Sequence, residues 1–328
     1  MSFYLTTTLS RCAVAALAVA SLGYLAASEV DPNLPDYTPV AGIAGNLKSV
    51  GSDSMNNMMT LWAEGFLRFY PNVQIEIEGK GSGTAPPALI EGTAHFGPMS
   101  RAFRGREEDN FENRYGYPVV ALPTSVDMLA VFVNKDNPIE GLNLQQVDAI
   151  FSSTRRGGAN SALTRWGAIG LTGSLSNQTI SLYGRNSASG TYGFFKDVAL
   201  FGGDYSDAVK EQPGSSAVIQ GVASELNGIG YSGIGYATAD VRPVPLATEA
   251  GQRFVAPTGD EVASGEYPLA RFLYVYVNHR PGSQMDPLRR EFIRYMFSKQ
   301  GQLDVVRDGY FPVGAGIAKR ALESVGIR

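Results

Sequence analysis

Two apolar stretches decide the predicted fold: Ser125-Val-Asp-Met-Leu-Ala-Val-Phe-Val-Asn134 and Leu269-Ala-Arg-Phe-Leu-Tyr-Val-Tyr-Val-Asn278. Both patterns predict strands, and each ends at an asparagine that is followed by a charged or proline-containing turn. They lie about 145 residues apart and bracket a section with its own α/β pattern. This arrangement predicts a protein of two lobes, between which the chain crosses twice.

Strand and helix patterns alternate outside these two stretches. After Gly51-Ser-Asp-Ser54, apolar residues recur at helical spacing as far as Phe69, and Val73–Glu78 then alternates as a strand. A glycine-rich loop leads into a second helix at Thr84-Ala-Pro-Pro, since prolines cost little in a first helical turn. A last amphipathic helix is predicted from about Pro287 to Arg307. Such alternation is typical of an α/β sheet.

The composition excludes several kinds of catalytic site. The chain has 328 residues, 27 basic and 31 acidic side chains, and a formal net charge of −4. This balance argues against a basic surface for nucleic acid. His95 and His279 are the only imidazoles and Cys12 is the only thiol, so Cys/His zinc sites and disulfide frameworks are excluded. We expect no metal and no cofactor, a buried or edge position for His95, and a surface turn for His279.

The first 28 residues have the pattern of a secretory signal peptide. Arg11 precedes an apolar stretch of 14 residues that ends at Leu25, and the small residues Ala26, Ala27 and Ser28 follow. The stretch is shorter than the roughly 20 residues that a bilayer span needs. Cleavage near Ala27 or Ser28 removes one arginine and no acid, which shifts the net charge from −4 to −5. The sequence therefore predicts an exported protein without a cysteine.

Three short Ser/Thr/Gly segments each precede a predicted helix. They are Gly51-Ser-Asp-Ser54, Gly81-Ser-Gly-Thr84 and Ser187-Ala-Ser-Gly-Thr-Tyr192. Free N–H groups at a helix start bind an anion together with the macrodipole, and Ser and Thr hydroxyls add donors. Arg185 lies four residues before Ser189 and can reach the same anion. One such segment alone is an ordinary N-cap, but three of them in both lobes predict an anion site.

In their order along the chain, these segments resemble the periplasmic phosphate-binding proteins, the substrate-binding subunits of phosphate ABC importers. The resemblance covers residues 46–315. Its most specific part is Arg185-Asn-Ser-Ala-Ser-Gly-Thr191, and further motifs are Pro71-Asn-Val-Gln-Ile75, Gly79-Lys-Gly-Ser-Gly-Thr84, Gly92-Thr-Ala-His-Phe-Gly-Pro-Met-Ser-Arg101, Leu144-Gln-Gln-Val-Asp-Ala-Ile-Phe151, Arg165-Trp-Gly167, Phe292-Ile-Arg-Tyr-Met-Phe-Ser-Lys-Gln-Gly301 and Asp308-Gly-Tyr-Phe-Pro-Val313.

The resemblance implies an α/β protein of the type II periplasmic-binding-protein fold with phosphate in the cleft. The implied organisation is a signal peptide at 1–28, a first lobe from 29–124, a second lobe from 125–266 and a return to the first lobe over 267–328. By position, the implied phosphate-binding residues are Asp53, Ser54, Ser82, Ser100, Arg185, Ser189, Gly190 and Thr191. The implied partners are inorganic phosphate and a membrane permease, the expected state is a monomer, and the expected location is the periplasm.

One position departs from the best-known members of that family. They have an aspartate that accepts the proton of hydrogen phosphate, whereas this chain has Ser100, followed by Arg101. We hypothesise that Asp53, where the family often has threonine, supplies the acceptor; the alternative is that Asp53 only caps its helix. We include Arg101 among the candidate phosphate-binding residues as a second cationic contact; the alternative is a surface residue.

Three other functions remain open from the sequence. The same fold could bind sulfate, another tetrahedral oxyanion or a phosphorylated metabolite. A secreted phosphatase or esterase could use Ser189 or Ser54 as nucleophile, but it needs a base within hydrogen-bond reach, and histidines are scarce. A stand-alone phosphate scavenger would need no transporter. The expectation is a binding protein and not an enzyme.

Overall fold

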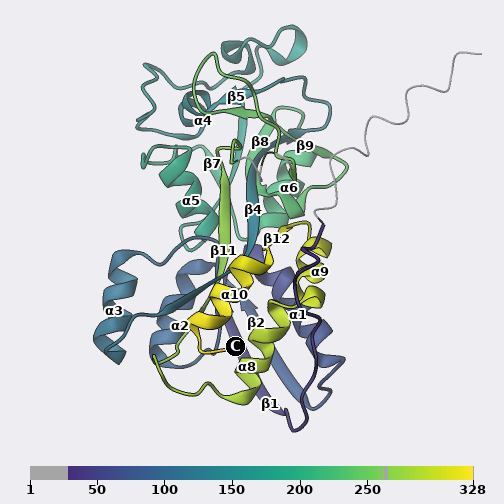
Figure 1. The fold of residues 1–328 in the computed structure, drawn as a ribbon. Helices are drawn as coiled ribbons and strands as arrows, with labels where there is room; N and C mark the ends of the chain where they lie inside the picture. Colours follow the sequence, from purple (N-terminus) through teal and green to yellow (C-terminus); the bar gives the residue numbers. More distant parts are fainter. Residues whose placement is uncertain (1–28, 260, 262–264, 328) are drawn as a thin grey trace, which may run out of the picture.

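Two long strands run side by side along the molecule in the computed structural model (Figure 1). They are β4 (Val120–Asn134) and β11 (Ala270–Val277), and they pair in antiparallel fashion. Both strands predicted from the apolar stretches are thereby confirmed. The structure describes residues 29–259, 261 and 265–327, so the predicted signal peptide at 1–28 lies outside the described residues.

Strand β4 belongs to both lobes. Its first part pairs with β11, whereas Leu129–Val133 pairs with β8 (Gly228–Gly233) of the other lobe. The order in this eight-stranded sheet is β3-β11-β4-β8-β6-β7, and β9 and β12 also pair with β4. The predicted lobe boundary at 124/125 falls inside β4, and the one at 266/267 falls shortly before β11.

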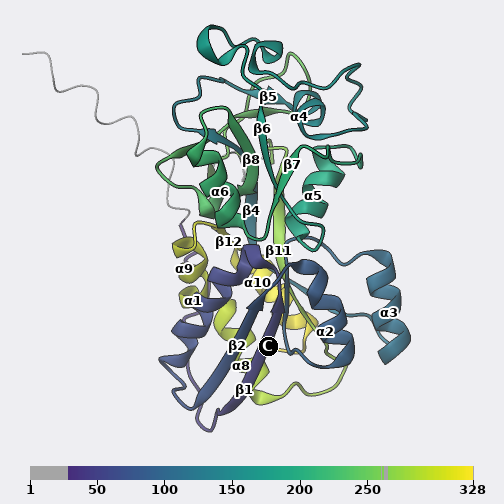
Figure 2. The same ribbon diagram turned by 180° about the vertical axis from the view of Figure 1, so that it is seen from behind.

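The remaining elements are divided between the two lobes (Figures 1 and 2). The other strands are β1 (Gly45–Gly51), β2 (Val73–Gly79), β3 (Gly97–Met99), β5 (Leu142–Asn143), β6 (Ser181–Arg185), β7 (Val209–Gln212), β9 (Val241–Pro243), β10 (Leu246–Ala247) and β12 (Phe311–Pro312). The helices are α1 (Asn56–Leu67), α2 (Ala85–Glu91), α3 (Gly105–Tyr115), α4 (Leu144–Phe151), α5 (Gly190–Val198), α6 (Ser215–Ser224), α8 (Pro287–Met296), α9 (Lys299–Arg307) and α10 (Ala315–Ser324). A membrane-spanning helix is not found in the described part of the chain.

The core of the first lobe forms around α1. A short 3₁₀ turn, Asp53–Met55, leads into this helix, whose predicted apolar stripe is buried against α8 and α9. The indole of Trp62 donates a hydrogen bond to the carbonyl of Gly301 at 2.8 Å. Strand β2, which its alternating pattern predicts, pairs in parallel with β1. The segment Asp53–Met55 is thus held at the end of a packed helix.

The core of the second lobe positions the end of β6. The rings of Phe195 on α5 and Tyr231 on β8 stack with centroids 3.9 Å apart. The hydroxyl of Tyr231 accepts a hydrogen bond from the backbone N–H of Arg185 at 3.1 Å. Packing of aromatic rings therefore fixes the backbone of the last residue of β6.

The expected single helix from Pro287 to Arg307 is wrong. Helix α8 ends at Met296, and a new helix, α9, starts at Lys299. Ser298 caps α9 by accepting a hydrogen bond from the N–H of Gly301 at 3.2 Å. Apolar residues continue at helical spacing through the break, so periodicity alone does not reveal it. The serine at the N-cap is the local signal that a new helix begins.

The expected surface turn for His279 is also wrong. Its side chain is buried, and burial lowers its pKa. The neighbouring Arg280 and Pro281 favour a turn of the backbone, but they do not determine where the imidazole points. His95 lies beside β1, where its Nδ1 accepts a hydrogen bond from the N–H of Lys48 at 2.9 Å. That position agrees with the expectation of a buried or edge histidine.

Candidate anion-binding site

The first lobe contributes three buried hydroxyls. Ser54 lies in the turn before α1, Ser82 starts the turn before α2, and Ser100 follows β3. The Oγ of Ser82 accepts a hydrogen bond from the N–H of Ser100 at 3.0 Å and lies 3.2 Å from the Oγ of Ser100. The tertiary structure thus brings the segment Gly81-Ser-Gly-Thr84 into contact with Ser100 at the end of the motif Gly92–Arg101.

The second lobe contributes the start of α5. Ser189 is the N-cap, and its Oγ accepts hydrogen bonds from the N–H groups of Thr191 at 3.2 Å and Tyr192 at 3.4 Å. Because that oxygen accepts from the backbone, the hydroxyl proton of Ser189 is free to serve as a donor.

The two lobes meet at these hydroxyls. The Oγ of Ser54 lies 2.8 Å from the Oγ1 of Thr191. A Cβ at Gly190 would lie 2.3 Å from the Oγ of Ser82 and 2.6 Å from the Oγ of Ser100. Only glycine therefore lets the start of α5 approach both serines, and the structure is closed around this site.

Arg185 provides a buried cation at the end of β6. Its side chain is 1% exposed. Nη1 lies 2.8 Å from the Oγ of Ser215 and 3.2 Å from Oδ2 of Asp53, and Nη2 donates to the carbonyl of Pro213. Burial lowers the pKa of Arg185, and Asp53 opposes that shift. Its Nε has no hydrogen-bond partner within the described residues.

Asp53 does not cap its own helix. The N-cap position of that turn is Ser52, which makes no side-chain cap. Instead, Oδ2 of Asp53 accepts a hydrogen bond at 3.0 Å from the N–H of Ser215, the first residue of α6 in the other lobe. The carboxylate therefore compensates the positive start of α6 and the charge of Arg185 from across the interface.

Arg101 lies at the edge of the site, but its guanidinium is occupied. Nη1 and Nη2 each donate to a carboxylate oxygen of Glu107 at 2.7 Å, and Nη1 also donates to the carbonyl of Ala102. Its donors thus stabilise the start of α3. The structure does not bring Arg101 together with the hydroxyls, so we leave it out of the proposed anion contacts.

Three residues of the closed interface were missed from the sequence: Ser215, Asp127 on β4 and Arg271 on β11. Ser52, which is buried next to Asp53, was also not named as a binding residue. Arg271 donates to Asp127, to the carbonyl of Ser100 and to the Oγ1 of Thr191. The sequence contained a signal for the pairing of Asp127 with Arg271, because each predicted crossing strand has one charged residue among apolar ones. Buried charges require partners, so the two charges should have been paired.

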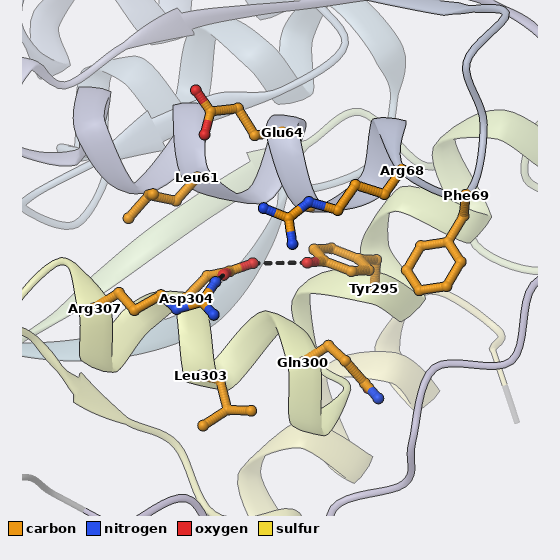
Figure 3. Close-up of a pocket in the computed structure, with 10 residues that line it drawn as sticks. Leu61, Glu64, Arg68, Phe69, Tyr295, Gln300, Leu303, Asp304 and Arg307 are labelled. Carbon is orange, nitrogen blue, oxygen red and sulfur yellow. Dashed lines mark hydrogen bonds and ion pairs between the residues drawn. The ribbon is translucent and has the colours of Figure 1, made fainter.

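A separate pocket lies on the surface of the first lobe, between α1 and α9 (Figure 3). Its cavity has a volume of about 170 Å³. At its base the hydroxyl of Tyr295 donates to Oδ2 of Asp304 at 2.7 Å. Two acidic residues, Glu64 and Asp304, and two basic ones, Arg68 and Arg307, line it. Arg307 is paired with Asp304 at 2.9 Å, so the lining is mixed in charge. Groups of acidic, histidine or cysteine residues suited to a metal are also absent from the described residues.

Two α/β lobes, two crossing strands and a buried polar site between the lobes define a type II periplasmic binding protein. The model of the PBP superfamily domain matches residues 37–300. The phosphate-binding protein PstS of Pseudomonas aeruginosa is 52% identical over 317 residues, which cover 96% of this chain and 98% of that protein. The chain therefore belongs to the PstS family of phosphate-binding proteins.

More distant relatives agree with this fold. PstS of Bacillus subtilis is 27% identical over 82% of this chain and 81% of its own length. The structure of a phosphate ABC transporter substrate-binding protein from Clostridium perfringens, described with bound phosphate, aligns with a TM-score of 0.69 at 23% identity and covers 82% of this chain and 99% of that one. An ABC-type phosphate transport receptor from Vibrio cholerae aligns with a TM-score of 0.64 at 22% identity, over 81% of this chain and 100% of that one.

Proposed function

We propose that this protein captures inorganic phosphate between its lobes and delivers it to the permease of an ABC importer. The observation that carries the proposal is a pair of buried donors without an acceptor, one from each lobe. The Oγ of Ser52 and the Nε of Arg185 have no hydrogen-bond partner within the described residues. Buried donors need acceptors, and an oxyanion between the lobes supplies them.

The residues around these donors support an anion more than any other ligand. Hydroxyls of Ser54, Ser82, Ser100, Ser189 and Thr191 are all at most 3% exposed and converge at the starts of helices or turns. Desolvation on closure strengthens each hydrogen bond to the ligand. Two arginines and two aspartates share the interface, so the local charge is balanced and the donors carry recognition.

Asp53 is our candidate for the acceptor that distinguishes phosphate from sulfate. Phosphate near neutral pH carries a proton that sulfate lacks, and an unpaired buried acceptor penalises the wrong ligand. Oδ2 of Asp53 is held by Arg185 and Ser215, while no protein hydrogen bond is made by Oδ1 among the described residues. This leaves one carboxylate oxygen for the proton of hydrogen phosphate.

A binding role is favoured over catalysis. A serine nucleophile needs a base within hydrogen-bond reach, and the hydrogen bond from Lys48 to His95 ties this imidazole to β1. The hydroxyl of Ser54 faces Thr191, and that of Ser189 caps α5. The relatives at 52% and 27% identity bear the names of binding proteins. Periplasmic location, a monomeric state and docking on a permease complete the proposal.

Calorimetric titration of the purified protein with phosphate, sulfate and arsenate tests the proposed function. We expect tight binding of phosphate, arsenate as a competitor and much weaker sulfate. Absence of heat with phosphate would contradict the proposal, and equal binding of sulfate would favour a general oxyanion receptor. Calorimetry is preferred over intrinsic fluorescence because Trp62 and Trp166 are both buried within the cores of their own lobes.

A further inference from the structure

Asp127 and Arg271 form a buried ion pair between the two crossing strands. Their Cα atoms are direct partners in the register of β4 and β11. Nε and Nη2 of Arg271 both donate to Oδ2 of Asp127, at 3.0 and 2.7 Å. The side chain of Asp127 is 0% exposed, and that of Arg271 is 3% exposed. The guanidinium is thus fixed at the place where the chain passes from one lobe to the other.

The remaining donors of Arg271 reach both lobes. Nη1 donates to the carbonyl of Ser100 in the first lobe at 2.8 Å. Nη2 also donates to the Oγ1 of Thr191, at the start of α5 in the second lobe, at 2.9 Å. One side chain on a crossing strand therefore contacts both halves of the anion site in the closed structure.

The contact with Thr191 decides what its hydroxyl can do. A threonine hydroxyl has one proton and two lone pairs. The Oγ1 of Thr191 accepts a hydrogen bond from Arg271 and lies 2.8 Å from the Oγ of Ser54. When Ser54 is the donor in this second contact, both lone pairs are occupied and the O–H of Thr191 is left to donate. The Oγ of Ser82 accepts from Ser100, and the Oγ of Ser189 accepts from Thr191. Each of these three oxygens thus already accepts at least one hydrogen bond from the protein, which favours its O–H as a donor to an oxyanion.

We propose that Arg271, held by Asp127, is a positioning residue that keeps the hydroxyl of Thr191 as a donor to the bound anion and couples this donor to closure of the lobes. The inference rests on the proposed capture of phosphate. Arg271 acts through Thr191. Asp127 neutralises the guanidinium, so that Arg271 orients a donor without adding net charge to the site. An unpaired buried arginine would cost considerable free energy.

A double-mutant cycle with Arg271→Lys and Thr191→Val tests this coupling. Lysine keeps a positive charge beside Asp127 but cannot hold the carboxylate, Ser100 and Thr191 in one planar fork. We expect each single variant to bind phosphate on the order of tenfold to a hundredfold more weakly by calorimetry. The double variant should be hardly weaker than Thr191→Val alone, because Arg271 acts through that hydroxyl.

A matched control is Arg294→Lys, since Arg294 also pairs with a fully buried carboxylate, that of Glu291, in α8 outside the site. It should retain the wild-type affinity for phosphate. If Arg271→Lys melts below the temperature of measurement, the neutral pair Asp127→Asn with Arg271→Gln takes its place in the cycle.

The outcomes separate this inference from the function on which it rests. Wild-type protein that gives no heat with phosphate overturns both. Phosphate binding by the wild type, together with unchanged affinity of Arg271→Lys, overturns only the role of Arg271. The role of Arg271 is also overturned if the two fold-losses in phosphate affinity multiply in the double variant, because Arg271 would then act independently of Thr191.

Discussion

Oδ2 of Asp53, in the first lobe, lies 3.2 Å from Nη1 of Arg185, in the second, and the same oxygen accepts the N–H of Ser215 at 3.0 Å. Arg185 is 1% exposed and the side chain of Asp53 is 25% exposed. The pair therefore joins the deep end of the site to its rim. Because the two residues lie in different lobes, opening of the lobes would separate them, which makes Asp53 both a closure contact and the candidate acceptor for a phosphate proton.

Asp53→Asn is expected to weaken phosphate binding by roughly tenfold to a hundredfold, the effect of losing a hydrogen bond to a charged group. Sulfate binding should fall less, because sulfate has no proton for Asp53 to accept. Calorimetry with both anions measures the ratio. Asp240→Asn, which removes an exposed partner of Lys135, is the control. Equal losses for both anions would leave Asp53 with a closure role only.

Ser52→Ala is expected to weaken phosphate binding about tenfold, since it removes a buried donor to a charged ligand. The matched control is Ser49→Ala. Ser49 lies on β1, and its Oγ is also buried without a partner in the described residues. Calorimetry should find a loss for Ser52→Ala and wild-type affinity for Ser49→Ala. If neither variant loses affinity for phosphate, Ser52 does not belong to the site.

Gly190→Ala is expected to hinder closure, because the new Cβ would lie 2.3 Å from the Oγ of Ser82. Overpacking of this kind costs about 1–3 kcal/mol, which weakens phosphate binding roughly tenfold to a hundredfold. Calorimetry measures the affinity, and small-angle X-ray scattering measures compaction on phosphate addition. Gly316→Ala is the control, as its nearest contact would be Nη1 of Arg320 at 3.7 Å. Normal compaction of Gly190→Ala would refute the steric argument.

Arg101→Gln is expected to leave the affinity for phosphate within about threefold, because the guanidinium is held by Glu107. The free energy of unfolding should fall by about 1 kcal/mol or less with the loss of this pair. Calorimetry and urea denaturation measure the two quantities. A loss of affinity of tenfold or more would restore Arg101 as an anion contact.

Asp308→Asn is expected to change how stability depends on pH. Burial raises the pKa of Asp308 to about 7, whereas the unfolded carboxyl ionises near its ordinary pKa of about 4. The folded state therefore binds the proton more tightly. The contribution of Asp308 to stability is fully present below about pH 4 and is lost as the pH rises to about 7. The variant should gain stability relative to wild type over that interval.

Urea denaturation at several pH values between about 4 and 8 measures this difference. Asp204→Asn is a control of opposite sign, because a hydrogen bond from Lys196 lowers the pKa of Asp204. Its small stabilising contribution is present above the unfolded pKa and is lost as the pH falls. A stability difference between Asp308→Asn and wild type that stays constant across the range would contradict the assignment.

The sequence predicted those features that depend on neighbouring residues. The N-cap role of Ser189 and the start of α5 at Gly190 follow from a local preference for serine before a helix. The crossing strands follow from unbroken apolar runs, and α1 follows from its apolar stripe. Motif order gave the family, which a relative at 52% identity confirms.

Only the tertiary structure decided which distant side chains meet. Arg271 pairs with Asp127 because the register of β11 on β4 places them opposite each other, and Asp53 meets Arg185 because the lobes close. The burial of His279 likewise appears only in the folded protein. The break at Ser298 is instead local, because that serine caps α9 three residues before Gly301. Capping and periodicity act within a few residues of chain, whereas register and lobe closure arise from contacts between segments more than a hundred residues apart. The sequence by itself therefore determined the donor-bearing helix starts, and the fold determined the ion pairs that orient them.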